Sequence, residues 1–175
     1  GVAPFGCRVQ VGGDILVGPA LSRLIVVSHE INGGSVGFQA RDLVIAETGV
    51  VTADSAGWRP DCGPGKGLKN GNSGGAGGYG GAGGAGGYGG AGGGTYPHPF
   101  RPTLPGSSGS LSGNYCGGAL LFALAGHARV DGTLSANGGQ ALGYYGAGSG
   151  GSIFLQCRRF SGSATGLLTA SGGNG

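Results

Sequence analysis

The residues with the clearest chemistry in this 175-residue chain are its four cysteines, Cys7, Cys62, Cys116 and Cys157. Cys62 and Cys116 lie on either side of a long glycine-rich segment, so a disulfide between them would contribute about 4 kcal/mol by closing that loop. Two fates are open for Cys157: a buried thiol, or a disulfide with Cys7 of a second molecule stacked end to end. An even number of cysteines in a glycine-rich, lysine-poor chain favours an extracellular or cell-surface location.

Histidines and carboxylates, the usual catalytic and metal-binding groups, are too scattered to form a site. The three histidines, His29, His98 and His127, show neither metal-ligand spacing nor a nucleophile partner. Among the seven acidic residues, Asp42 and Glu47 are the nearest candidates for a general acid and a general base, and they form no convincing pair. The sequence therefore predicts no catalytic residue, no metal, no cofactor and no enzymatic activity.

Charge and hydropathy bear on the partners of the chain. The formal net charge is only +3, and Arg158-Arg159 is the only adjacent basic pair, so we expect no nucleic-acid partner. The longest apolar run, residues 119–125, is far shorter than the ~20 residues that cross a bilayer, so we expect no membrane insertion. The chain contains no methionine, which indicates a processed product or part of a longer protein and is compatible with a removed secretory signal.

The strands that must position these residues are predicted from a sequence repeat. Three copies begin with Gly-Ser or Gly-Ala, continue with alternating apolar residues and end in a short apolar run with an alanine: residues 34–57, 118–139 and 151–173. The first and third copies have the same spacing, and the second is one residue shorter. Period-two alternation indicates strands, so each copy is predicted to hold three short strands separated by turns within roughly 20–25 residues.

A unit of this size cannot bury its apolar face alone, so the copies must stack. We therefore predict an all-β fold, a parallel β-helix (β-solenoid) of about three to four coils, with Val36, Leu120 and Ile153 in one interior column. Residues 9–31 are expected to form an irregular first coil or cap. A β-sandwich of short strands is the alternative, but it does not require copies of matching length.

Short polar residues follow the last strand of each copy. Asp54, Asn137 and Ser171 stand where their side chains can hydrogen-bond the turning backbone. The predicted organisation is an N-terminal cap and first coil at 1–63, a Gly/Pro-rich insertion at 64–115, and the second and third coils at 116–175.

The insertion has a strict triplet pattern. In residues 74–91 every third residue is alanine or tyrosine and the others are glycine. A polyproline-II-like helix has three residues per turn, which would place these side chains along one edge. We expect an ordered, polyglycine-II-like tract that folds back on itself, lies across the coils or reaches a neighbouring molecule, with residues 106–118 and 143–151 as packing partners. A flexible linker is the alternative. Tyr79 and Tyr88, nine residues apart, are candidate interface residues.

Two sequence stretches resemble a known class of protein. Gly-Gly-Ser-Ile at 150–153 and Gly-Leu-Leu-Thr-Ala-Ser-Gly-Gly-Asn-Gly at 166–175 resemble the glycine-rich repeats of large secreted or surface proteins of microbes that are expected to be parallel β-helices. The resemblance covers roughly 33–57 and 117–175, and the insertion departs from it. It implies a structural or adhesive extracellular role and supplies no catalytic residues.

The predicted function follows from the end of the last copy, because an uncapped solenoid exposes strand edges that can pair with another molecule. We expect a structural protein, a homo-oligomeric protomer of an extracellular filament or surface layer that assembles by end-to-end stacking. Leu121 and Phe154 face outward and are candidates for lateral contacts. The alternative is a glycan- or ice-binding adhesin-type module, with glycans as partners. A carbohydrate lyase or hydrolase has the least support.

Overall fold

The computed structural model describes residues 6–96, 100–110 and 115–174, and its regular elements within these ranges are all β-strands. The all-β prediction is therefore confirmed. Within the same ranges, no helix has the length and hydropathy that crossing a bilayer would need. His98 lies outside the described residues.

Three of the sheets are parallel and contain four strands each. Sheet 1 is β1 (Cys7–Gln10), β4 (Val36–Ala40), β9 (Ala119–Leu124) and β12 (Ser152–Gln156). Sheet 2 is β2 (Ile15–Val17), β5 (Leu43–Ile45), β10 (His127–Val130) and β13 (Arg159–Gly162). Sheet 3 is β3 (Arg23–Ile25), β6 (Val50–Thr52), β11 (Thr133–Ser135) and β14 (Leu167–Thr169). Parallel pairing argues against a sandwich, whose sheets are antiparallel.

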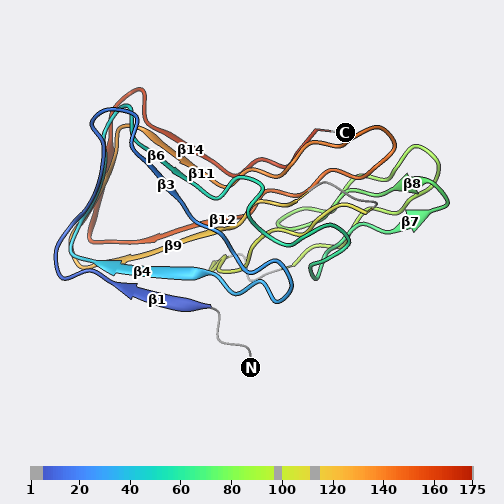
Figure 1. Cartoon of the computed structure of the whole chain (residues 1–175), viewed down its shortest axis with the longest axis horizontal. Coiled ribbons are helices and arrows are strands. Elements are labelled where there is room, and N and C mark those ends of the chain that lie inside the picture. The colour runs from blue at the N-terminus through green and yellow to red at the C-terminus, as the bar shows by residue number, and fades with distance from the viewer. Residues whose placement is uncertain (1–5, 97–99, 111–114, 175) are drawn as a thin grey trace.

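The chain runs through sheets 1, 2 and 3 in turn and does so four times; we call each such run a passage. Each new strand pairs beside the strand from the previous passage (Figure 1). The first passage is more regular than the sequence indicated. Residues 9–31, expected to form an irregular coil or cap, contribute to β1, β2 and β3, which pair in parallel register with β4, β5 and β6. The alignment to the repeat is poor because Ile25 pairs with Thr52, so that an apolar residue takes the place of a polar one.

The core consists of the inward residues that alternate along these strands. Leu120 lies opposite Ile153, and Val36 precedes Gly37, which pairs with Leu121, so the three residues share one register position as expected. The rings of Phe38 and Phe122 stack with centroids 5.1 Å apart. Among the described residues, fourteen buried ones form the central cluster, and the alternation in the sequence determines which strand side chains enter it.

A ladder of polar side chains follows sheet 3. The Asp54 carboxylate accepts a hydrogen bond from the Asn137 backbone N–H at 2.6 Å, and the Asn137 side-chain oxygen accepts one from the Ser171 N–H at 2.9 Å. These side chains bond the turning backbone as predicted, but in the next passage of the chain. They therefore fix the register between passages.

The glycine-rich segments form a second packed region, on the right in Figure 1, beside sheets 1 and 3. Its backbone hydrogen bonds recur at three-residue steps: the N–H groups of Gly74 and Gly77 donate to the carbonyls of Tyr144 and Ala147, both at 2.9 Å. Within the insertion, the N–H groups of Gly93 and Tyr96 donate to Ala76 and Tyr79, also at 2.9 Å. The tract therefore folds back on itself and packs on 143–151, as expected, and the linker alternative is wrong.

A short antiparallel hairpin, β7 (Lys69–Asn70) with β8 (Ser73–Gly74), lies in this region. Gly71 in its turn has a φ of 56°, a left-handed conformation that suits glycine. We call the glycine-rich segments 65–94, 104–110, 115–118, 136–151 and 171–173 the glycine bundle.

Candidate assembly surfaces

The strands from the first and last passages are the edges of the three parallel sheets. We call the edge formed by β1, β2 and β3 the first end, and the edge formed by β12, β13 and β14 the last end. Within the described residues no further strand pairs with either end. Each end therefore presents unpaired N–H and C=O groups, which can template pairing with another chain.

The rows of apolar core residues extend to these ends, where their last side chains are exposed. Leu24, Val51, Leu134 and Leu168 occupy one register position across sheet 3. Val51 and Leu134, in the middle, are 0% exposed, whereas Leu168 is 43% exposed at the last end. Phe160 in β13 is exposed in the same way. Apolar side chains at positions that are buried in the middle strands are therefore exposed at the last end.

A row of ionisable residues runs across sheet 2 where its strands begin. One register position holds Asp14, Asp42, His127 and Arg159. His127 pairs with Arg159. The other two directly precede Ile15 and Leu43, which lie in register with Ala128, the residue after His127. The Arg41 guanidinium bonds both oxygens of Asp14, at 2.8 and 2.6 Å, and lowers the pKa of that carboxyl. Asp42 accepts the His127 backbone N–H at 2.6 Å. The row has a carboxylate, paired with Arg41, at the first end and a guanidinium at the last.

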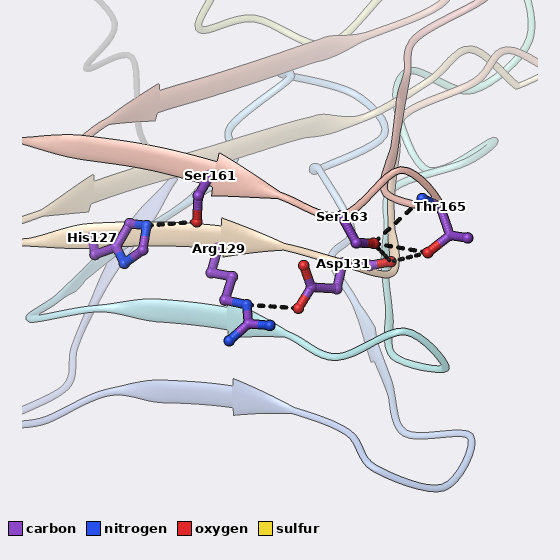
Figure 2. A network of polar contacts seen from close by, with 6 residues as sticks. All are labelled: His127, Arg129, Asp131, Ser161, Ser163 and Thr165. Atoms are coloured by element: carbon purple, nitrogen blue, oxygen red, sulfur yellow. Dashed lines mark hydrogen bonds and ion pairs between the residues drawn. The ribbon is translucent and has the colours of Figure 1, made fainter.

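Figure 2 shows the polar contacts on β10 and the segment of β13 beside it. The His127 ring nitrogen Nε2 lies 2.8 Å from the Ser161 hydroxyl, and Arg129 forms an ion pair of 2.7 Å with Asp131. The Asp131 backbone carbonyl accepts from Ser163 and Thr165 in the turn that follows β13. These groups satisfy one another and tie neighbouring passages together. Among the described residues, no group of histidine, cysteine and carboxylate side chains could hold a metal ion.

All four cysteines lie in the described ranges, and all four are free thiols. The expected bond between Cys62 and Cys116 is not formed; both residues instead hydrogen-bond to the segment that contains Gly106 and Ser108. The Cys62 N–H donates to the Ser108 hydroxyl, and the Cys62 carbonyl accepts from the Ser108 hydroxyl and N–H. The Cys116 thiol donates to the Gly106 carbonyl at 2.6 Å. Burial raises the pKa of Cys116 to about 12. This thiol is thus a buried, hydrogen-bonded group.

Cys7 and Cys157 lie at opposite edges of sheet 1. Cys7 is exposed in β1, opposite Val36, and Cys157 directly follows β12, which ends at Gln156. Cys157 is half-buried against the core cluster. No bond between Cys7 and Cys157 joins the two ends within one chain.

The two tyrosines of the nine-residue repeat have different environments. Tyr79 is half-buried, its hydroxyl donates to the Leu104 carbonyl at 2.6 Å and contacts the Ser152 hydroxyl, and its ring meets Tyr96 edge-on at 5.0 Å. Burial raises the pKa of Tyr79 to about 12 and raises that of Tyr96 further. Tyr79 therefore ties the insertion to β12 inside the molecule. Tyr88, in contrast, is 69% exposed.

The outer face of sheet 1 holds the two apolar residues expected to make lateral contacts. Leu121 is 2% exposed, so its proposed role at the surface is wrong: the sequence shows that it faces out of the sheet, but not that it lines a hollow together with Arg101 and Thr103, which follow the glycine tract. Phe154 is half-buried and lines the same hollow, of about 240 Å³, with Arg8, Arg101 and Thr103. Of this pair, only Phe154 keeps an open surface.

Sequence reasoning missed the exposed residues Leu142, Tyr144 and Tyr145. The sequence does contain a signal for this exposed group: Tyr144-Tyr145 is an aromatic pair in a segment made mostly of small residues.

Comparison of the chain with protein-family models, with curated proteins and with solved structures finds no match. The functional argument therefore depends on the geometry of the chain itself.

Proposed function

We propose that this chain is a structural protomer: a parallel β-helix of four coils that assembles end to end into a filament or surface layer. In this proposal each passage through the three sheets is one coil, and the glycine bundle is a polyglycine-II-like corner of the helix. The observation that carries the proposal is the row Leu24, Val51, Leu134 and Leu168, whose middle members are fully buried and whose last member is 43% exposed. A further coil stacked on the last end would bury Leu168 as its own molecule buries Leu134.

The register supports a specific arrangement of neighbours. A second molecule that continues the strand spacing of ~4.8 Å would place its Leu24 on Leu168 and its Ile15 on Phe160, matching the rows of sheets 3 and 2. Its Arg8 would lie beside Phe154, because both share a row in sheet 1. Apolar residues would meet apolar residues, and a guanidinium would meet an aromatic ring.

Charge supports the same arrangement. The row Asp14, Asp42, His127 and Arg159 ends in a cation at the last end. A stacked neighbour would bring its Asp14 next to Arg159. Opposite charges at corresponding positions favour this register over slipped ones.

The same register excludes the disulfide between molecules that the sequence left open. The neighbour's Cys7 would lie beside Ile153, four residues from Cys157. Four residues of strand span about 13 Å, whereas the Cα atoms of a disulfide are less than ~7 Å apart. Because the thiols are free, the proposed extracellular or cell-surface location rests on composition and on the resemblance to secreted repeats.

The test is the dependence of self-association on one exposed residue of the last end. Leu168→Asp places an unpaired charge in the proposed interface, and Leu142→Asp is the matched control, because Leu142 is also exposed but lies in the glycine bundle. Sedimentation velocity over a range of concentrations should show large assemblies for the natural chain and Leu142→Asp, and monomers for Leu168→Asp. Monomers for all three proteins at high concentration, or equal assembly for all three, would refute the proposal.

A further inference from the structure

The glycine bundle carries an exposed aromatic surface next to its hairpin. Tyr88 and Tyr144 are 69% and 65% exposed, and their rings meet edge-on with centroids 5.4 Å apart. Tyr145 and Leu142 are also exposed, and Asn72 lies in the turn between β7 and β8. In Figure 1, β7 and β8 lie at the far right of the glycine-rich region, away from the labelled sheet strands. We call these five residues the tyrosine patch.

Hydrogen bonds hold the backbones of the two central tyrosines in place, and their rings contact each other. The Tyr88 N–H donates to the Ser73 hydroxyl at 3.1 Å, and the Asn70 side-chain amide donates to the Tyr88 carbonyl at 3.4 Å. The Tyr144 carbonyl accepts from the Gly74 N–H at 2.9 Å. The backbones of both tyrosines are thus tied to the same hairpin, which reduces the ordering that ligand binding would require of this part of the chain.

The patch contains two neighbouring hollows. One, of about 270 Å³, is lined by Asn72, Ser73, Tyr88 and Tyr144. The other, of about 430 Å³, is lined by Asn72, Leu142, Gly143, Tyr144 and Tyr145. Asn72 and Tyr144 line both, so a ligand that occupied the two hollows would run past an amide and an aromatic ring at its centre.

The lining chemistry selects the kind of ligand. None of the described residues that line the two hollows is charged, so nothing in the lining recognises a phosphate, a sulfate or a carboxylate. Tyrosine rings offer apolar faces with a polar edge, and the Asn72 amide both donates and accepts hydrogen bonds. A sugar ring has the complementary character: a face of C–H groups and a rim of hydroxyls.

We propose that the tyrosine patch binds a neutral oligosaccharide, with adjacent sugar units in the two hollows. Tyr144 stacks against the ligand at the centre, Tyr88 and Tyr145 flank it, and Asn72 hydrogen-bonds its hydroxyls. The site lies in the glycine bundle and contains no residue of the strands that form the first and last ends. It therefore does not depend on the stacking of molecules.

The experiment titrates the full chain, by isothermal calorimetry, with four neutral probes: cellohexaose, laminarihexaose, mannohexaose and hexa-N-acetylchitohexaose. Binding to at least one probe is expected with a dissociation constant below about 1 mM. Tyr144→Ala should weaken it at least about tenfold, whereas Tyr144→Phe should cost less than about threefold, since it keeps the stacking face. Phe160→Ala, which removes an exposed ring at the last end, is the matched control and should bind like the natural chain.

Tyr144 is mostly exposed, so its truncation should leave the thermal unfolding temperature unchanged, which separates a lost contact from a lost fold. Failure of all four probes at about 10 mM would overturn the proposal. So would binding that Tyr144→Ala leaves intact. A loss of self-association in Tyr144→Ala, measured by sedimentation without any sugar, would show that the patch is a contact between copies of this chain and would also overturn it.

Discussion

Two adjacent glycines of the triplet tract should respond in opposite ways to the same substitution. A Cβ atom at Gly83 would lie 2.7 Å from the Ala76 carbonyl carbon and closer still to its oxygen, whereas ordinary contact begins at 3.4 Å. A Cβ atom at Gly84 would meet nothing within 4 Å. The obstacle at Gly83 is backbone, so no side-chain rotation can relieve it.

The size of the effect follows from the bonds that hold Gly83 in place. To accommodate Gly83→Ala, the two segments must separate, which disturbs the hydrogen bonds from Ala76 to Gly84, from Gly83 to Gly93 and from Gly93 to Ala76, each 2.9 Å long. At about 1 kcal/mol each, the loss is about 2–3 kcal/mol of local stability. Gly84→Ala should instead be neutral or stabilise the chain by about 0.4–1 kcal/mol, because alanine reduces the entropy of the unfolded state.

Hydrogen exchange measured by mass spectrometry on peptides from residues 74–94 tests this difference. Gly83→Ala should speed exchange of the tract about 30- to 150-fold, and Gly84→Ala should leave it unchanged or slow it. Equal exchange in both variants would refute the packed tract, since a linker has no reason to distinguish neighbouring glycines. Gly86→Ala and Gly87→Ala form a second pair with the same contrast.

Two further predictions concern the core and the buried ionisable groups. Leu134→Ala should lower the free energy of unfolding by about 2–5 kcal/mol, because Leu134 is fully buried. Leu168→Ala, measured on dispersed monomer, should lower it by less than half as much, because Leu168 is partly exposed. Urea denaturation measures both losses, and equal losses would contradict the assigned burial. Burial raises the pKa of Cys116 and of Tyr79 to about 12, from 9.0 and 10.0, so both stay neutral in the folded state while the unfolded chain ionises. Stability should therefore be complete below about pH 9 and fall progressively up to about pH 12. Cys116→Ala should flatten the early part of that decline, and an unchanged profile would contradict the burial of this thiol.

The strands and the direction of their side chains could be predicted because alternation translates directly into inward and outward positions. Val36, Phe38 and Ala40 in the first copy match Leu120, Phe122 and Leu124 in the second, and the structure pairs these strands in register. The first passage was harder to recognise because it lacks the Gly-Ser opening and the polar residues of the ladder. Its pairing is supplied by the neighbouring strands and not by its own pattern.

Contacts made across the insertion could not be predicted. The positions of Cys62 and Cys116 in the sequence suggest a closed loop, but not that both residues bond to the segment with Gly106 and Ser108. Leu121 faces outward as its pattern indicates, yet the chain covers it. The β7–β8 hairpin did have a local signal, the Gly71-Asn72 pair, which is typical of two-residue hairpin turns.

The boundary between the insertion and the last two repeats was also less sharp than the composition indicated. Gly77 in the insertion bonds to Ala147, and Ser107 accepts the Ser149 N–H at 3.0 Å. The glycine bundle is therefore shared by 64–115 and by segments of 116–175. Composition locates glycine-rich sequence but does not show which segments of it pack together.

Fibre diffraction from oriented assemblies of the purified protein tests the central claim most directly. End-to-end stacking of four coils predicts a reflection at ~4.8 Å along the fibre axis and an axial repeat of about 19 Å for each molecule, four times the strand spacing. A protein that stays monomeric at high concentration, or fibres whose ~4.8 Å reflection lies across the axis, would contradict it.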